Sequence, residues 1–266
     1  MRRGNLFWGF VIILVGIVFL LTNLDIFKGI NPWNLIWPVF LISAGGWILF
    51  GHMIGQDRRV EATQAAIPLE GASRAIVKIN HAAGKLSLDA SAAPGQLASG
   101  SFEGGMRYTA RSEGDTLKVN MEPSSPGTFF FSWGWSSGFN WSFGLSRDIP
   151  ITLKVHTGAN ESQLDLTDLK VTELELHTGA SSTTVKAPAN AGYTFMKAEI
   201  GAASLSIQIP SNVAARIRAT GGLAYISVDS SRFPKSNGIY QSPDYETAAN
   251  KVEIRVDAGV GSVNIR

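Results

Sequence analysis

Apolar and polar residues alternate along most of the chain, in segments that are each interrupted by a short turn of small residues. Alternation with a period of two is typical of a strand with one buried face. Each segment is therefore expected to hold a strand, a turn and a second strand. The six copies begin at Val77, Leu153, Leu174, Met196, Ile217 and Ile254.

The turns align on one small residue in each copy, and the three middle intervals are 21, 22 and 21 residues. These anchors are Ala82, Gly158, Gly179, Gly201, Gly222 and Gly259. The positions three before and six after each anchor are apolar in every copy: Ile79, Val155, Leu176, Ala198, Ala219 and Val256, then Leu88, Leu164, Val185, Ile207, Val228 and Ile265. A short repeat buries such a face only by stacking on its neighbours. The pattern predicts an all-β, single-stranded β-solenoid of right-handed type, with coils of about 21 residues.

The solenoid is expected to span residues 71–266, with successive coils stacked in chain order. Glycine suits the anchors because tight turns often need a positive φ angle. An additional strand pair is predicted at Gly105–Arg111 and Asp115–Met121, joined by an SEGD turn. The long interval between Gly222 and Gly259 contains a loop rich in turn-forming residues, which we expect to be exposed to solvent.

Two long apolar runs, residues 6–22 and 35–51, each lack a charged residue over 17 positions. Such runs are at the short end of what spans a bilayer. We expect a transmembrane helical hairpin over residues 1–52, followed by a polar juxtamembrane linker over residues 53–70. The alternative is a cleaved signal peptide followed by a buried helix, but no small-x-small cleavage motif follows the first run.

The orientation follows from the positive residues beside the two runs. Arg2 and Arg3 precede the first run and Arg58 and Arg59 follow the second, whereas the connecting loop holds only Lys28. The positive-inside rule then places both ends in the cytoplasm. We expect a bacterial inner-membrane protein with two spans, the lipid bilayer as a partner, and a cytoplasmic C-terminal domain.

Composition excludes several function classes. Residues 1–59 contain five of the 23 Lys and Arg residues and two of the 21 Asp and Glu residues, so the rest of the chain is close to neutral. No basic surface for nucleic acid is expected. With no cysteine, disulfides and thiolate sites are excluded. The sequence has no catalytic or phosphate-binding motif, and we expect neither an enzyme nor a cofactor.

An aromatic, Gly/Ser-rich insertion over residues 122–147 interrupts the repeat. These aromatics either pack on the solenoid and cap an open edge, contact the membrane interface, or bind a protein or glycan. As a candidate interaction patch they are Phe129, Phe130, Phe131, Trp133, Trp135, Phe139, Trp141 and Phe143.

Two histidines, His156 and His177, lie two positions before the anchors of adjacent coils, and His81 is one position off that column. Their side chains are expected to point outward, about one strand spacing of 4.8 Å apart. Two histidines make an incomplete metal shell, and a polar ladder on a solvent-exposed face explains them without a metal. We therefore predict no metal site.

The segment NPWNLIWPVFLISAGGWILF resembles the transmembrane region shared by LiaI- and LiaF-like bacterial membrane proteins. The stretch from Ile149, IPITLKVHTGANESQLDLTDLKVTELELHTGASSTTVKAP, resembles the start of the toast-rack domain of LiaF-like and adhesin-like proteins, and the ending YETAANKVEIRVDAGVGSVNIR resembles its close. The resemblance implies a membrane-tethered, non-catalytic β-solenoid. Better-known members are accessory regulators of two-component systems that sense envelope stress. They carry more than two membrane spans, and a sensor-kinase partner is implied by the resemblance alone.

Two functional hypotheses follow. The first is a membrane-anchored protein whose solenoid binds another protein, in envelope-stress signalling. The alternative is an adhesin-like or self-associating scaffold at the cell envelope. The side of the membrane on which the C-terminus lies separates them, because signalling needs a cytoplasmic domain and adhesion an external one.

Overall fold

The computed structural model describes residues 62–124 and 139–266 of the 266-residue chain. Within these ranges all regular elements are strands, and they form one 14-stranded sheet. No helix in the described part is long and apolar enough to span a membrane. The predicted spans 6–22 and 35–51 lie outside the described residues. The strands are β1 Ala62–Pro68, β2 Arg74–Asp89, β3 Gln96–Glu103, β4 Met106–Glu113, β5 Thr116–Pro123, β6 Phe139–Leu145, β7 Ile151–Asp165, β8 Val171–Thr178, β9 Ser182–Lys186, β10 Tyr193–Gln208, β11 Ala214–Val228, β12 Lys235–Ser236, β13 Ile239–Gln241 and β14 Lys251–Ile265.

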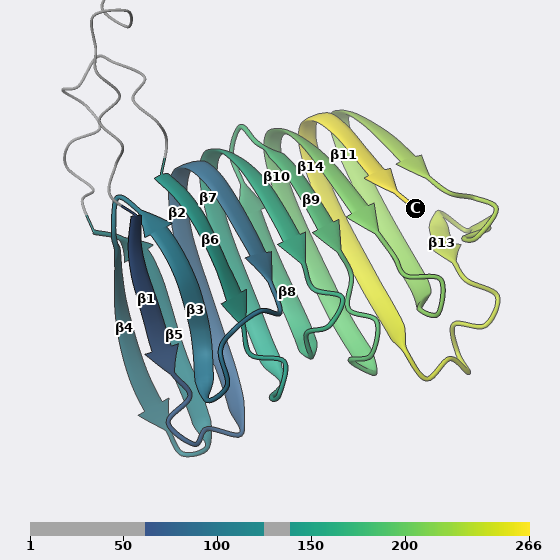
Figure 1. Ribbon diagram of the computed structural model, residues 1–266. Helices are drawn as coiled ribbons and strands as arrows, with labels where there is room; N and C mark the ends of the chain where they lie inside the picture. Colours follow the sequence, from purple (N-terminus) through teal and green to yellow (C-terminus); the bar gives the residue numbers. More distant parts are fainter. Residues whose placement is uncertain (1–61, 125–138) are drawn as a thin grey trace, which may run out of the picture. The chain divides into compact units, whose positions relative to one another are not determined.

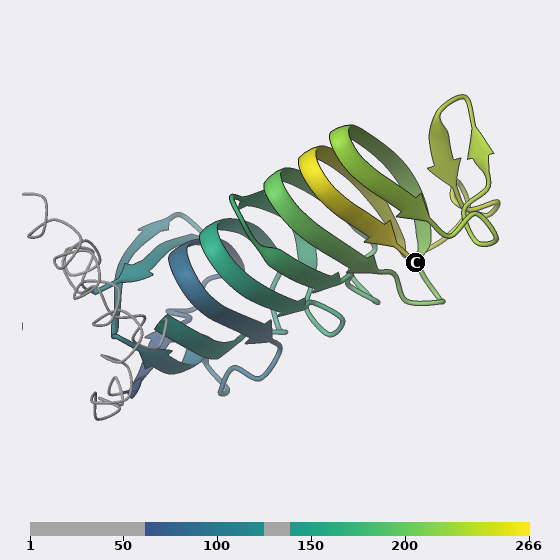
Figure 2. The ribbon, with the colours of Figure 1, turned by 90° about the horizontal axis from the view of Figure 1, so that it is seen from above.

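Each regular coil is built around one bent strand. In Figure 1 a strand rises behind the stack, bends over its top and descends in front, and Figure 2 shows these bends lying side by side. We call the part before the bend the first arm and the part after it the second arm. Strands β10 and β14 pair in parallel along both arms, and the register is the same on the two sides of Gly201 and Gly259. Beside β7, two separate strands, β8 and β9, take the places of the two arms.

The predicted inward columns form the core between the two arms. Ten of the twelve apolar positions around the anchors are buried, including Ile79, Val155 and Ile265. Ala219 and Val228 are half-buried on β11. Among the described strands β13 covers the first arm of β11 only at Arg216 and Ile217, and the second arm pairs with β14 alone. The repeat pattern therefore identified the core correctly, and only stacking could bury it.

The anchor glycines are required for a different reason from the one predicted. None of Gly158, Gly179, Gly201 or Gly259 has a positive φ angle. Instead, adjacent bends approach closely: a Cβ atom on Gly158 would lie 2.4 Å from the Ala82 carbonyl oxygen, a distance that no real Cβ contact tolerates. Glycine lets one backbone approach the next, so the anchors form a column through the stack.

The order of the last two coils differs from chain order. Strand β14 inserts between β10 and β11 and pairs in parallel with both. Its inward residues Val252, Ile254 and Val256 are buried. Strand β11 comes earlier in the chain than β14 but lies beyond it in the stack.

Two boundaries also differ from those predicted. Strand β1 (Ala62–Pro68) lies within the predicted linker 53–70 and pairs with β3, so the sheet begins earlier than residue 71. Strand β6 (Phe139–Leu145) lies within the predicted insertion 122–147, yet it pairs in parallel with the second arm of β2. The predicted strand pair is confirmed as the antiparallel β4 and β5.

Candidate functional site

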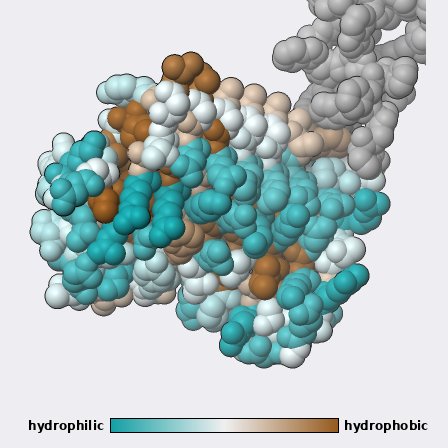
Figure 3. Space-filling view, turned by 180° about the vertical axis from the view of Figure 1, so that it is seen from behind, coloured by the Kyte–Doolittle hydropathy of each residue, from teal (hydrophilic) through white to brown (hydrophobic). Residues whose placement is uncertain are grey.

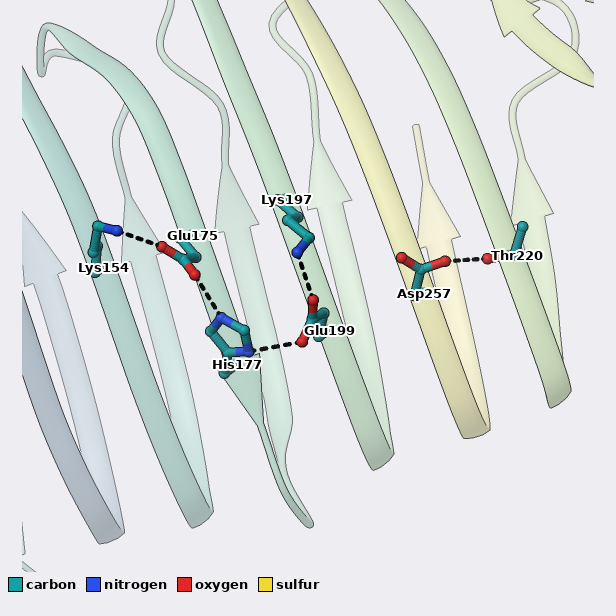
Figure 4. Close-up of polar contacts among 7 residues, drawn as sticks. All are labelled: Lys154, Glu175, His177, Lys197, Glu199, Thr220 and Asp257. Atoms are coloured by element: carbon teal, nitrogen blue, oxygen red, sulfur yellow. Dashed lines mark hydrogen bonds and ion pairs between the residues drawn. The ribbon is translucent and has the colours of Figure 1, made fainter.

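A polar ladder crosses the outer face of the first arms, at the level where the arms approach the bend. Lys154 Nζ lies 2.7 Å from Glu175 Oε2, and Glu175 Oε1 lies 2.8 Å from His177 Nε2. His177 Nδ1 lies 3.0 Å from Glu199 Oε2, and Glu199 also pairs with Lys197. The ladder therefore links three adjacent coils through contacts of the two carboxylates with lysine and histidine side chains (Figure 4).

The same contacts set the electrostatics of the ladder. Hydrogen bonds from Lys154 and then His177 lower the pKa of Glu175 to about 2. The Glu175 carboxylate in turn raises the pKa of Lys154, and Lys197 lowers the pKa of Glu199. These groups stabilise one another in their charged forms. Perturbed pKa values here thus have a structural cause, since the partners are neighbours in the sheet.

His156 and His177 point outward on adjacent coils as predicted, with ring centroids 4.8 Å apart. Burial, followed by the charge of Lys78, lowers the pKa of His156. Both ring nitrogens of His177 face carboxylates, which leaves neither free for a metal ion. Among the described residues no three His, Asp or Glu side chains are grouped to hold one. An open depression is lined by the two histidines together with Thr157, Thr178 and Glu199.

The aromatic cluster of β6 is part of the core. Trp141 is 1% exposed, and its ring lies 5.3 Å from that of Phe102, edge to face, and 5.1 Å from that of His81. Phe143 is also buried, 5.3 Å from Phe102. Two of the eight residues of the predicted interaction patch are therefore unavailable for binding, and for these two the packing alternative holds.

The remaining members of that patch differ in position. Phe139 is half-buried at the start of β6, and its carbonyl oxygen lies 3.0 Å from His81 Nε2. Burial lowers the pKa of His81, so the ring is kept neutral inside the fold. The other candidates lie outside the described residues: Phe129, Phe130, Phe131, Trp133, Trp135 and the topology determinants Arg2, Arg3, Arg58 and Arg59.

A third surface, which sequence reasoning missed, lies at the bend of the last two coils. Leu223 is 83% exposed, Tyr225 73% and Val260 52%, and Leu223 pairs with Val260 across the β11–β14 ladder. We call these three residues the apolar corner. Seen from behind, the surface is mainly hydrophilic, with a hydrophobic area at the upper left, where the C-terminal coils bend (Figure 3).

A sequence signal for the apolar corner did exist. The register aligns Leu223 and Val260 with Ala202, and Tyr225 with Ser262 and Ser204. Outward positions of the second arms are thus small or polar in β10 and become larger and more apolar toward β11. The inward columns carry no trace of this change, so a repeat pattern defined by its inward positions does not detect it.

Comparison with known proteins gives two family matches. Residues 55–208 match the N-terminal domain of toast_rack, and residues 7–62 match the LiaF transmembrane domain. These matches confirm both parts of the resemblance read from the sequence. The match to the LiaF transmembrane domain associates the chain with a membrane. No curated protein matches the chain.

Two solved structures resemble the fold. A candidate cell adhesion protein from Clostridium sporogenes is 20% identical, with a TM-score of 0.68 over 77% of this chain and 98% of that one. A candidate adhesin from Bacteroides fragilis is 8% identical over 80% and 100% of the two chains, and its TM-score of 0.26 carries no argument. The first structure supports the fold alone. Because the toast_rack match covers more than half of the sequence, this chain belongs to the family defined by the N-terminal domain of toast_rack.

Proposed function

We propose that this chain is a non-enzymatic bacterial inner-membrane protein whose β-stack binds another protein, as an accessory regulator of envelope-stress signalling. Two transmembrane helices anchor it, and the β domain lies in the cytoplasm. The signalling role and the sensor-kinase partner come from the resemblance to LiaF-like regulators, and the contact surface comes from the structure.

The apolar corner is the observation that carries this proposal. Five large hydrophobic side chains are exposed in the described part of the chain, and three of them, Leu223, Tyr225 and Val260, are close neighbours on two coils. Isolated exposed apolar residues are ordinary, whereas a group of them marks a contact surface. Tyrosine in particular is enriched where proteins bind one another.

The polar ladder supports a non-catalytic role. Its carboxylates and lysines pair with one another along the sheet, and the depression beside His177 is open to solvent. A catalytic site instead needs a concave pocket in which reactive groups converge on a substrate. The ladder fits a solvated face that holds adjacent coils in register.

The test is site-specific photo-crosslinking of the full-length protein in bacterial membranes. A photoreactive residue replaces Tyr225 in one variant and Tyr108, which is also exposed but lies on β4 at the opposite end, in the control. We expect capture of a second membrane or signalling protein from position 225 and none from position 108. Equal capture from both positions, or from neither, contradicts the proposal.

The adhesin-like scaffold remains the second candidate, favoured by the fold shared with the Clostridium sporogenes protein. A reporter that is active only outside the cytoplasm, fused after Arg266, separates the two functions. The signalling proposal expects no activity from this fusion, and full activity from a matched fusion that carries a reporter active only in the cytoplasm. External activity would overturn the cytoplasmic assignment and favour adhesion.

A further inference from the structure

The strands at the ends of the stack differ in how their free edges are protected. Strand β4 carries Arg107, Arg111 and Glu113 along its edge, and β1 ends in Pro68, which has no N–H group to donate. The first arm of β11 is covered: β13 pairs with it at Arg216 and Ile217. Charge, proline and covering strands are the usual means by which natural sheets prevent edge-to-edge pairing.

The second arm of β11 has none of these protections. Residues 223–228 read LAYISV, without a charge, a proline or a glycine, and among the described strands they pair only with β14. Ala224, Ile226 and Val228 point toward the core but are half-buried, because no further coil covers them. An uncharged, apolar edge of this composition pairs readily with another strand.

The direction of the free backbone groups can be assigned. The Asp229 N–H group donates to the Ile265 carbonyl oxygen at 2.9 Å, so Asp229 faces β14. In a parallel ladder the N–H and C=O groups of one residue point to the same side, and successive residues alternate. The backbone N–H and C=O groups of Tyr225 and Ser227 therefore also point toward β14. Those of Ala224, Ile226 and Val228 point to the open edge.

We propose that this edge binds the same edge of a second copy of the chain, in an antiparallel, two-fold symmetric pair. The proposal rests on the proposed function in one respect, that the last coils form the contact surface. The two-fold axis passes beside Ile226, so that Ile226 of one copy lies directly opposite Ile226 of the other. Ala224 of each copy then pairs with Val228 of the other. In this register all three free residues are hydrogen-bonded.

The composition of the edge fits a second copy. Because residues 221–228 carry no charge, bringing two identical edges together creates no like-charge repulsion, which two charged edges would suffer. On the outer face Tyr225 lies opposite Ser227 of the second copy, and the two Tyr225 side chains become diagonal neighbours within reach of each other. The two apolar corners then meet in one larger surface. Tethering to the same membrane raises the effective concentration of the two copies.

Disulfide crosslinking in native membranes tests the register directly, because the chain has no cysteine of its own. In full-length Ile226→Cys the two substituted residues face each other with Cα atoms about 5.5 Å apart, within the range that a disulfide bridges. We expect most of this variant to become a covalent dimer on mild oxidation. Ala224→Cys and Val228→Cys alone should yield at least about tenfold less dimer, because in this register neither residue meets its own copy. A mixture of these two variants should crosslink.

Two further variants keep the proposal falsifiable. Tyr225→Lys, which places two ammonium groups near the axis, should reduce dimer formation by Ile226→Cys several-fold, and Tyr108→Lys on β4 should not. Absence of a covalent Ile226→Cys dimer overturns the proposal, and so does equal crosslinking at positions 224, 226 and 228. Crosslinking of position 226 to a cysteine introduced on β1 instead would mean head-to-tail stacking, which also overturns it.

The outcome separates this proposal from the proposed function. If Ile226→Cys does not dimerise while position 225 still captures a different protein, self-association fails and the function stands. If Ile226→Cys dimerises but no different protein is captured, the two-fold pair stands and the regulatory function fails.

Discussion

The two ends of the β-stack solve the same problem in opposite ways. At the N-terminal end, β6 adds Trp141 and Phe143 to the core beside Phe102, and the outer strand β4 is charged. At the C-terminal end, β11 leaves Ile226 half-buried and displays Leu223 to solvent. Every stack of parallel coils has two open ends. In this chain one end is closed by aromatic packing and charge, whereas the other is left available for contact.

This difference teaches that aromatic content alone does not locate a binding surface. The tryptophan and phenylalanine of β6 were the more conspicuous residues in the sequence, yet they stabilise the fold. The less conspicuous leucine and valine at the bend are exposed. The buried aromatic residues thus lie at the N-terminal end, whereas the contact surface that we propose lies at the C-terminal end, and the following predictions test that division.

The largest effect is expected from Trp141→Ala. Trp141 is fully enclosed, and removing such a ring leaves a cavity that lowers the free energy of unfolding by about 3–5 kcal/mol. Thermal or denaturant unfolding of the full chain followed by circular dichroism measures it. Trp141→Phe is the control: the indole N–H has no hydrogen-bond partner among the described residues, so only volume is lost and the effect should be clearly smaller. A loss below about 1 kcal/mol for the alanine variant contradicts the packing role.

The second effect concerns the close approach of β2 and β6 at the same end. Gly84 has a φ angle of +113°, and a Cβ atom there would lie 2.2 Å from the Phe139 carbonyl oxygen. Gly84→Ala should therefore cost about 1–3 kcal/mol of backbone strain, measured as above. Gly238→Ala is the control, because its φ is also positive, at +80°, but its surroundings are open. Equal losses would mean that φ alone, and not the contact with β6, requires glycine at residue 84.

A smaller effect is expected in the polar ladder, which lies on β7, β8 and β10 between the two ends. The pKa of Glu175 falls from 4.5 to about 2 on folding, so the folded state binds its proton less tightly than the unfolded state. Its contribution to stability is complete above pH 4.5 and is lost as the pH falls toward 2. Glu175→Gln should flatten the pH dependence of Tm in this window, by at most about 1 kcal/mol because solvent screens exposed pairs.

The control for that titration is the double variant Glu175→Gln with Lys154→Gln. It should add no further change of slope in the same acidic window, because the carboxylate that Lys154 contacts is already absent. If the single Glu175 variant leaves the slope unchanged, the ladder does not stabilise the register of the coils.

The smallest effect on stability is expected at the C-terminal end. Leu223→Ser should change the free energy of unfolding by no more than about 0.5 kcal/mol, because Leu223 is almost fully exposed. The same variant should lose most of the photo-crosslinking from position 225. Leu205→Ser, on the inward face of β10, is the opposite control and should unfold the domain. A destabilised Leu223 variant with intact crosslinking would reverse the division between the two ends.

The sequence predicted the core well and the order of the coils poorly, for one physical reason. Alternation reports which face of a strand is apolar, so Ile79, Val155 and Ile265 could be assigned to the interior. It does not report which strand lies beside which, and β14 fits between β10 and β11 as well as it fits after β11.

The candidate site was harder to predict than the fold. The outward positions of His156 and His177 follow from their place in the repeat, but their partners depend on neighbouring coils: Glu199 reaches His177 only because β10 lies beside β8. Leu223 is exposed because it occupies an outward position of its arm, and a repeat defined by its inward positions does not single it out. Trp141 was predicted to lie in an insertion because the segment that contains β6 lacks the anchor turn that marks the other coils.

Backbone hydrogen exchange of the full-length protein in membranes tests the division between the two ends most directly. It compares the amides of residues 223–228 with those of the charged edge strand β4, residues 106–113, in membranes and in dilute detergent. The structure predicts that Ala224, Ile226 and Val228 exchange more slowly in membranes, where the edge is covered, and that β4 exchanges alike in both. Protection of β4 with no change at residues 223–228 would contradict the assignment of the C-terminal end as the contact surface.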